Sequence, residues 1–432
     1  MAVPLLLGLV LGEAGLATLS IRSRSQQTRR RLAVRAAAFG VLVVLAIVGG
    51  IEWGLRYYAL ALWLFLLLAI AIANTRLDGS SGRRPRDRRV VLNALAVSGV
   101  TFFAMSPALV FPEYSPLEPT GGFAVATSAD TLTDPSRVEP YADSGELRSV
   151  NVGYWYPDLA DEASDRTFPL VVFSHGGTGI RTGNESLFLE LASHGYVVAS
   201  IDHPHHSLFT TDDSGSRTWI DWGYFGDLRR ENARADPQQS HVYYEEWMAI
   251  RMGDVSFVLD HLLAEAGREA SAEVYRLIDT ERISVGGHSL GGSAALGTGR
   301  ARDDVRAVIA LESPFMADIR GVRDGRFIWE EADYPRPVLL VYSDSAWSHL
   351  GEWPQYAKNH ELLSAESATV VNLHIAGVGH LGLTDLALAS PVLTWLLDGQ
   401  RARDARGALA SLNEATLEFL DAHLKGVGAG SR

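Results

Sequence analysis

The chain of 432 residues contains no cysteine, which excludes disulfide bridges, cysteine nucleophiles and thiolate metal sites. Lysine is nearly absent as well, with two residues against 36 arginines, a bias that we interpret as the composition of a GC-rich bacterial genome. Acidic residues are scarce at one end. The first 112 residues hold 13 arginines and four carboxylates, whereas the remaining 320 carry 25 basic and 47 acidic side chains. This division of charge predicts two different regions, and the acidic one should repel nucleic acid.

Four long apolar runs lie before residue 113, at positions 3–19, 36–51, 58–73 and 90–111. A helix that crosses a bilayer core of about 30 Å needs about 20 mostly apolar residues. The third and fourth runs fit best, the second is acceptable, and Glu13 weakens the first. The first run also lacks the basic start and small-residue site of a cleavable signal peptide. We therefore expect residues 1–112 to form a transmembrane region of about four helices, with core helices of a soluble domain as the alternative.

The arginines predict how this region lies in the membrane. Segments 22–35 and 76–89 hold six arginines each, whereas the turn near Glu52 and Trp53 holds almost none. The positive-inside rule then places both segments in the cytoplasm, and with four spans everything after Phe111 lies outside. We expect a multi-pass protein of a bacterial cell membrane, in contact with the lipid bilayer, whose C-terminal domain is extracytoplasmic.

The second region begins after a stretch rich in proline and glycine at 113–122, which we interpret as a linker. From 123 to 427, β-rich runs alternate with helical patterns. Several of the runs are continuously apolar, which is typical of parallel strands covered on both faces. The alternation predicts a mostly parallel, doubly wound α/β fold, with its active site at the carboxyl ends of the strands. The expected strands are 148–157, 169–175, 196–202, 282–288, 305–312, 337–343 and 369–375.

One of these strands runs directly into the sequence Gly-His-Ser-Leu-Gly at 287–291, which a helical pattern follows. This G-x-S-x-G motif between strand and helix is typical of a nucleophile elbow, a strained turn that exposes a serine hydroxyl. Glycines two residues before and after the serine let strand and helix approach each other. Ser289 is therefore the candidate nucleophile, and the Leu290 N–H at the start of the helix is a candidate oxyanion donor. The alternative is a glycine-rich turn with a passive serine.

A nucleophilic serine needs a base and an acid that orients it. His380 follows the last expected strand, which suits the chain order serine, acid, histidine. Glu312 ends the strand after the serine's helix and is our preferred acid, with Asp344 at the end of the next strand as the alternative. The second oxyanion donor should come from the loop after 169–175, where we choose Gly177, with Gly176 beside it.

The segment "IDHPHHS" at 201–207 raises the question of a metal site, because three histidines and Asp202 follow a strand. Neighbouring histidines in a loop are weak support for a metal, so we expect neither metal nor cofactor. We expect His203 to line the substrate cleft instead, together with His288 and Gly176. The aromatic-rich stretch 203–247 is either a lid or acyl-binding wall or an ordinary packed loop.

From about residue 119 to 426 the chain resembles the platelet-activating factor acetylhydrolase family of the lipoprotein-associated phospholipase A2 type. The resemblance rests on "FPLVVFSHGGTGIRT", "LASHGYVVASIDH", "RISVGGHSLGG", "VIALESPFM", "GVGHLGLTD" and "SLNEATLEFLDAHL", which occur in the family's order. The family usually has aspartate where Glu312 stands, and the membrane region is not part of its pattern. Carried over residue by residue, the resemblance implies these site residues: Ser289, His380, Glu312, Gly177 and Leu290.

The resemblance implies an α/β-hydrolase fold and a serine esterase that needs no cofactor. Added to the membrane region, it leads us to expect a membrane-anchored esterase for short-chain or oxidised, phospholipid-like esters. A general carboxylesterase or a cutinase-like polyester hydrolase is the alternative within enzymes. A non-catalytic membrane receptor or scaffold that kept the fold is the alternative from another class.

Overall fold

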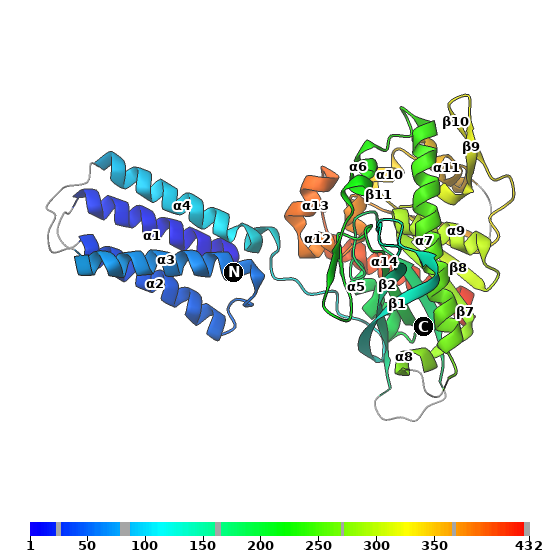
Figure 1. The fold of residues 1–432 in the computed structure, drawn as a ribbon, viewed down its shortest axis with the longest axis horizontal. Coiled ribbons are helices and arrows are strands. Elements are labelled where there is room, and N and C mark those ends of the chain that lie inside the picture. The colour runs from blue at the N-terminus through cyan, green and yellow to red at the C-terminus, as the bar shows by residue number, and fades with distance from the viewer. Residues whose placement is uncertain (23–26, 78–86, 160–165, 269–271, 365–368, 427–432) are drawn as a thin grey trace. The chain divides into compact units, whose positions relative to one another are not determined.

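The computed structural model describes residues 1–22, 27–77, 87–159, 166–268, 272–364 and 369–426. Its contacts divide the chain into two compact units (Figure 1). Unit 1 comprises Met1–Ser115 with Ala389–Leu393, and unit 2 comprises Pro116–Leu388 with Thr394–Arg432. The expected catalytic domain, 123–427, ends one residue beyond the described part of the chain.

Unit 1 is helical and exposes many large apolar side chains. Its long helices are α1 (Ala2–Arg22), α2 (Gln27–Ile47), α3 (Leu55–Leu77) and α4 (Asp87–Val110). Leu60 and Met105 are buried between them, whereas Phe103 exposes 78% of its surface. Apolar side chains that face outward suit a lipid surrounding better than water, where large exposed apolar patches are rare.

Three of these helices, Ala2–Arg22, Leu55–Arg76 and Asp87–Val110, are long and apolar enough to cross a membrane. Of the described residues in α2, the first turns carry four arginines, which leave too short an apolar stretch. In the described part of the chain, the structure thus has the four expected helices but three candidate spans. Parts of the two arginine-rich segments, at 23–26 and 78–86, lie outside the described residues.

Unit 2 is built on an eight-stranded sheet with the order β1-β2-β4-β3-β7-β8-β11-β12. The pairs β1–β2 and β2–β4 are antiparallel, and the neighbours from β4 to β12 pair in parallel. Two small hairpins, β5–β6 and β9–β10, lie outside this sheet. The strands are β1 (Ala124–Val138), β2 (Leu147–Asp158), β3 (Phe168–Ser174), β4 (Val197–Asp202), β5 (Phe209–Thr211), β6 (Arg217–Trp219), β7 (Ile278–His288), β8 (Val305–Leu311), β9 (Ile319–Arg323), β10 (Arg326–Trp329), β11 (Val338–Ser343) and β12 (Val370–Ile375).

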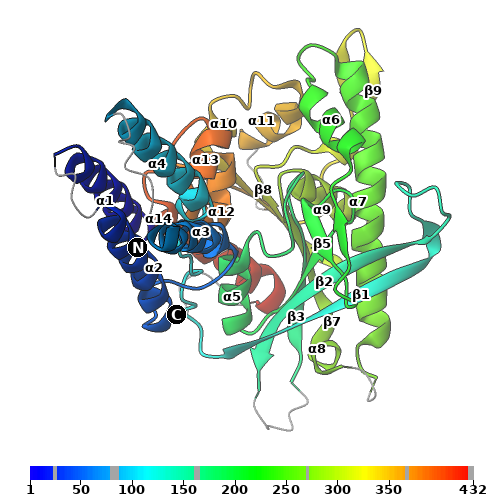
Figure 2. The same ribbon diagram turned by 60° about the vertical axis from the view of Figure 1, so that its left-hand side comes forward.

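Helices cover both faces of this sheet, as Figure 2 shows for α5 and α7. The further helices of the chain are α5 (Glu185–Ser193), α6 (Trp222–Arg230), α7 (Pro237–Glu265), α8 (Glu273–Arg276), α9 (Leu290–Ala301), α10 (Asp344–Trp347), α11 (Ala357–Leu363), α12 (Leu386–Ala389), α13 (Pro391–Asp398) and α14 (Ala405–Leu420). The helix α7 begins with Pro237, after an Asp236 side chain that accepts a hydrogen bond from the Gln239 N–H. Aspartate before proline is a favourable helix start.

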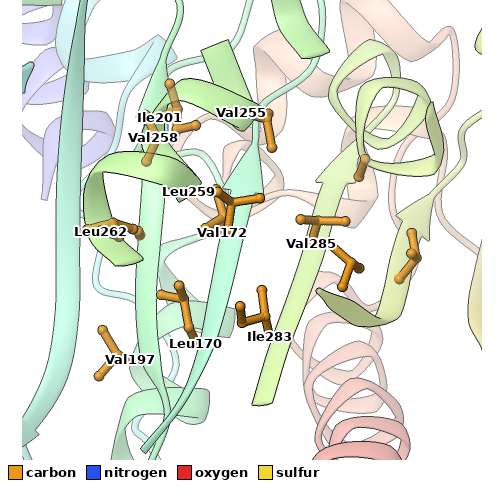
Figure 3. Packing of buried hydrophobic residues seen from close by; sticks show 14 of the residues in the cluster. Leu170, Val172, Val197, Ile201, Val255, Val258, Leu259, Leu262, Ile283 and Val285 are labelled. Carbon is orange, nitrogen blue, oxygen red and sulfur yellow. The ribbon is translucent and has the colours of Figure 1, made fainter. Parts of the chain in front are cut away.

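Alternation along β3 sends its side chains into two cores. Leu170 and Val172 pack with Val258 and Leu262 of α7, a contact seen in Figure 3. Val171 and Phe173 belong instead to the cluster that contains residues of α5 and α14. A strand buried on both faces reads as a continuous apolar run, which is why the sequence pattern predicted the parallel strands.

All seven expected strands are present, but β1 was not expected. It lies at one edge of the sheet, its sequence is largely polar, and most of its residues are exposed or half-buried. The linker at 113–122 also differs from expectation, because its second half is bound to α5. Leu117 N–H donates to Ser186 Oγ (2.9 Å), and Gly121 N–H donates to Ser193 Oγ (3.0 Å).

Candidate active site

Ser289 lies in the turn between β7 and α9, and its backbone has φ 54° and ψ −124°. Non-glycine residues rarely adopt a positive φ, and those that do cluster at functional sites. The flanking glycines are required by close packing. A Cβ atom on Gly291 would lie 2.0 Å from the carbonyl oxygen of Ser174, and one on Gly287 would lie 2.3 Å from the carbonyl carbon of Gly291. The sequence therefore forms the strained strand-to-helix turn that its motif predicted.

His380 and Glu312 come together beside this turn. His380 Nδ1–H donates to Glu312 Oε1 over 2.7 Å, and the other carboxylate oxygen accepts from the Ser343 N–H (2.6 Å). The rings of His380 and His288 lie 4.5 Å apart, so the imidazole stands next to the residue that precedes Ser289. Within the described part of the chain, Ser289 Oγ has no hydrogen-bond partner, which is common for catalytic hydroxyls before substrate binds.

The electrostatics of the pair favour a charged histidine. Burial alone lowers the pKa of His380, but the hydrogen bond and negative charge of Glu312 outweigh burial and raise that pKa above its ordinary value. Burial raises the pKa of Glu312, and its bonds to His380 and Ser343 more than reverse this, so the carboxylate stays ionised. An imidazole stabilised in its protonated form is suited to accept a proton from a serine hydroxyl.

Asp344, the alternative acid, forms no hydrogen bond or ion pair with His380 among the described residues. Its carboxylate bonds to His374 Nε2 (2.8 Å) and accepts from the Gly377 N–H (2.8 Å). Asp344 thus braces the loop that leads to His380, whereas Glu312 holds the imidazole itself.

The two expected oxyanion donors are available. In the described chain, neither the Gly177 N–H nor the Leu290 N–H donates to another residue. The loop that carries Gly177 lies against the turn, because a Cβ atom on Gly176 would be 3.5 Å from Ser289 Cβ. Two amides without acceptors in the described chain are what the prediction of an oxyanion site at Gly177 and Leu290 requires.

His288 is buried, and its Nε2–H donates to the carbonyl oxygen of His380 (3.1 Å). Burial and the nearby charge of His380 lower the pKa of His288 to about 3, so this imidazole stays neutral. We expected His288 to line the substrate cleft. The structure instead shows it supporting the backbone of the candidate base.

His203 is fully buried and does not lie on a cleft wall, which corrects our expectation. Its Nδ1 bonds to Asp254 (2.8 Å) and its Nε2 bonds to Ser174 Oγ (2.8 Å). Sequence reasoning missed this arrangement because its three members come from three distant elements. Among the described residues, no group of three or more histidine and carboxylate side chains is placed to hold a metal ion.

The aromatic-rich stretch 203–247 is largely packed. Tyr224, Tyr244 and Trp247 are buried in one cluster with Leu290, directly behind the serine turn. Trp219 and Trp222 are exposed. These buried aromatics agree with the second expectation, an ordinary packed stretch.

Comparison with known proteins shows which family the chain resembles. The model of the family "Platelet-activating factor acetylhydrolase, isoform II" matches residues 155–249 and 258–427. The platelet-activating factor acetylhydrolase of Bos taurus is 25% identical over 302 residues, which cover 65% of this chain and 63% of that protein. The protein of the same name from Cavia porcellus is 24% identical over 281 residues, covering 60% and 58%. The matched part thus spans about three fifths of the length of these relatives.

A solved structure shares the fold. The ferulic acid esterase from Streptomyces cinnamoneus superposes with a TM-score of 0.55 at 24% identity, covering 73% of this chain and 95% of that one. Together with the sheet order and its covering helices, this likeness shows that unit 2 has the α/β-hydrolase fold.

Proposed function

The chain belongs to the platelet-activating factor acetylhydrolase family, and from this premise we propose that it is a membrane-anchored serine esterase with the triad Ser289, His380 and Glu312. The observation that carries the proposal is the 2.7 Å bond between His380 and Glu312 beside a serine held at positive φ. No metal or cofactor takes part in this chemistry.

In the first half of the reaction, His380 Nε2 takes the proton of Ser289 as Oγ attacks the ester carbonyl. The negative charge that develops on the carbonyl oxygen is stabilised by the N–H groups of Gly177 and Leu290. Glu312 keeps the imidazole in the tautomer that accepts the proton and stabilises the imidazolium that forms. His380 then gives the proton to the leaving alkoxide, and an acyl-enzyme remains.

In the second half, His380 removes a proton from water, which attacks the acyl carbonyl. The tetrahedral intermediate uses the same two amides, and its collapse returns the proton to Ser289 Oγ and releases the carboxylic acid. Overall, one water molecule is consumed and one ester bond is broken.

We propose short-chain or oxidised phospholipid-like esters as substrates, because the relatives are named platelet-activating factor acetylhydrolases. The apolar helices of unit 1 support a location at a membrane, where such esters are found. The alternative within enzymes is a general carboxylesterase or polyester hydrolase.

Labelling of the full-length protein with a fluorophosphonate tests the reaction class. We expect labelling of the wild type and none of Ser289→Ala. Absence of label on the folded wild type, or label that persists in the variant, contradicts a Ser289 esterase and favours a non-catalytic role. A turnover panel of p-nitrophenyl esters and short-chain phospholipids then separates the two ester classes.

We propose that unit 2 faces away from the cytoplasm, as the arginine-rich segments indicate. Placing both arginine-rich segments in the cytoplasm requires α2 to cross the membrane despite its arginines, because otherwise α3 would be the one crossing between the two segments and would put them on opposite sides. Alkaline phosphatase fused after Phe111 should be active, and green fluorescent protein fused there should not fluoresce after Sec export. The reverse pattern means three crossings and a cytoplasmic unit 2.

A further inference from the structure

Arg251 on α7 is a buried cation without a carboxylate partner. Its side chain is fully buried, and within the described chain it forms no ion pair. Its guanidinium donates instead to uncharged acceptors: the carbonyl oxygens of His175 (2.6 Å), Gly176 (3.2 Å) and Gly177 (3.5 Å), and Nδ1 of His206 (3.2 Å). A buried charge is costly unless it is paired, so this placement calls for an explanation.

A second arginine of unit 2 shows the ordinary solution. Arg148 is as deeply buried, but it forms ion pairs with Asp254 (2.6 Å) and Glu139 (2.6 Å). The difference is that Arg251 faces backbone carbonyls of three consecutive residues, 175–177. These residues form the loop that carries the proposed oxyanion donor Gly177.

The contact of Arg251 with these carbonyls fixes the direction in which the Gly177 N–H points. In a trans peptide, the carbonyl of one residue and the N–H of the next point in opposite directions. The Gly176 carbonyl faces Arg251, so the Gly177 N–H must point away from the guanidinium. That N–H is one of the two amides at the site without an acceptor in the described chain.

Other donors hold the same loop. The Tyr224 hydroxyl donates to the Gly177 carbonyl (2.6 Å), and its ring stacks on His206 with 3.7 Å between centroids. The Gly179 N–H and His175 Nδ1–H also donate to the Gly176 carbonyl, over 3.2 and 2.6 Å. Arg251 differs from these in bonding all three carbonyls and in bringing a positive charge.

We infer that Arg251 is a positioning residue of the oxyanion site, which holds the carbonyls of 175–177 so that the Gly177 N–H is directed at the oxyanion. The inference rests on the proposed esterase function. Arg251 does not touch substrate, and its charge polarises the peptide groups whose N–H ends stabilise the transition state. Loss of Arg251 should therefore weaken transition-state binding more than substrate binding.

The test uses the full-length protein in detergent, with p-nitrophenyl butyrate as substrate and an alkyl trifluoromethyl ketone as inhibitor. The ketone adds to the serine and forms a tetrahedral oxyanion, so its affinity reports on the oxyanion site. Removal of a direct oxyanion donor costs about 10²- to 10³-fold in kcat, so we expect Arg251→Met to lose about 30- to 100-fold with KM changed less than about threefold. Affinity for the ketone should fall in parallel with kcat/KM.

Two further variants grade the effect. Arg251→Lys keeps the positive charge but cannot bridge three carbonyls. Tyr224→Phe removes the hydrogen bond to the Gly177 carbonyl and keeps the size of the side chain. Each variant should lose about three- to tenfold in kcat. Arg148→Met is the matched control. It removes an equally buried arginine away from the loop and should lower the unfolding midpoint while kcat stays within about threefold of the wild type.

The outcomes separate this inference from the proposed function. If a folded Arg251→Met variant keeps both kcat and ketone affinity within threefold, or loses kcat with unchanged ketone affinity, Arg251 does not act on the oxyanion site. If Arg251→Met does not fold, the same comparison on Arg251→Lys and Tyr224→Phe decides. If the wild type is neither labelled nor active, the esterase proposal fails first and the inference with it.

Discussion

Unit 2 contains two constellations of serine, histidine and carboxylate in which the histidine bonds to the carboxylate over a similar distance. In the first, His380 bonds to Glu312 over 2.7 Å beside Ser289. In the second, His203 bonds to Asp254 and to Ser174 Oγ, both over 2.8 Å. Residue types and the length of the histidine–carboxylate bond therefore do not distinguish a candidate triad from a structural one.

The surroundings of the two constellations differ in three ways. Ser174, His203 and Asp254 have no exposed surface, whereas 32% of the His380 side chain is exposed. Ser174 ends a regular strand, but Ser289 lies in a strained turn with two free amides beside it. An ester cannot reach a fully buried serine, and without oxyanion donors its transition state would not be stabilised. Substrate access and oxyanion donors therefore decide which constellation can be catalytic.

Charge separates the two histidines further. Burial and the charge of Arg251 lower the pKa of His203 to about 4 despite its bond to Asp254, so this imidazole stays neutral. The Asp254 carboxylate forms an ion pair with Arg148. Burial raises the pKa of Asp254, but the charge and hydrogen bonds of Arg148 outweigh burial and hold this pKa far below its usual value. Glu312 instead bonds to the uncharged Ser343 N–H, and its charge is left to act on His380.

Glu312→Gln should produce the largest effect on the first constellation. Because the Ser343 N–H needs the amide oxygen, the amide nitrogen of Gln would face His380 Nδ1 and force the wrong tautomer. We expect a loss of about 10⁴-fold in kcat, the magnitude measured for such a change in a serine protease. Steady-state kinetics with p-nitrophenyl butyrate measure this loss.

Asp344→Asn is the matched control, because Asp344 ends the neighbouring strand and bonds to His374. We expect it to lose less than about tenfold, since it acts only on the loop before His380. If Asp344→Asn abolished turnover while Glu312→Gln kept it, the acid assignment would be wrong.

Asp254→Asn should affect the second constellation mainly through stability. It leaves buried Arg148 without one of its two carboxylates, and breaking a buried pair costs about 3–5 kcal/mol. Urea unfolding of the full chain in detergent, followed by tryptophan fluorescence, measures this loss. The kcat of the folded variant should stay within about threefold of the wild type, because a structural constellation acts on stability.

The control lies on the same helix. Asp260 exposes 66% of its side chain and pairs with Arg302, so Asp260→Asn should cost less than about 1 kcal/mol. Loss of turnover in a stable Asp254→Asn variant would show that the buried constellation takes part in the reaction.

The sequence predicted those parts of the candidate site that are built from residues adjacent in the chain. The turn at Ser289 was predictable because its glycines, strand and helix are contiguous, and the chain order pointed to His380. The second constellation was not predictable, because Ser174, His203 and Asp254 are brought together only by packing. For the same reason the sequence could not tell that His203 is buried.

Arg251 and strand β1 were missed for related physical reasons. Arginine side chains are mostly exposed in folded proteins, and only the fold turns Arg251 toward the loop at 175–177. The strand β1 is polar because it lies at the edge of the sheet, where apolar alternation is not required.

The pH at which kcat/KM begins to fall should show which of the two histidines acts as the base. Below that pH, kcat/KM should drop about tenfold for each pH unit. His380 acts as a base only when neutral, and the bond to Glu312 raises its pKa above 6.5. The kcat/KM value should therefore fall as the pH drops through an inflection above 6.5. In Glu312→Ala, burial is opposed by the charge of Asp398 without the bond to Glu312, so the inflection of the residual activity should move to a lower pH than in the wild type. An inflection near 4 in the wild type would point to His203 instead.

Ser174→Ala gives the smallest change and the most direct test of the comparison. His203 Nδ1–H must donate to Asp254, so Nε2 accepts the Ser174 hydroxyl proton, the arrangement expected of a catalytic serine. If access and oxyanion donors decide function, loss of this hydroxyl should cost only about 1 kcal/mol of stability, the net value of one buried hydrogen bond. Ser284→Ala, which removes a buried hydroxyl bonded to the Ala307 carbonyl (2.9 Å), is the control for that cost. Fluorophosphonate labelling and kcat should match the wild type in both variants, and a loss of either in Ser174→Ala alone would mean that the buried constellation is coupled to the reaction at Ser289.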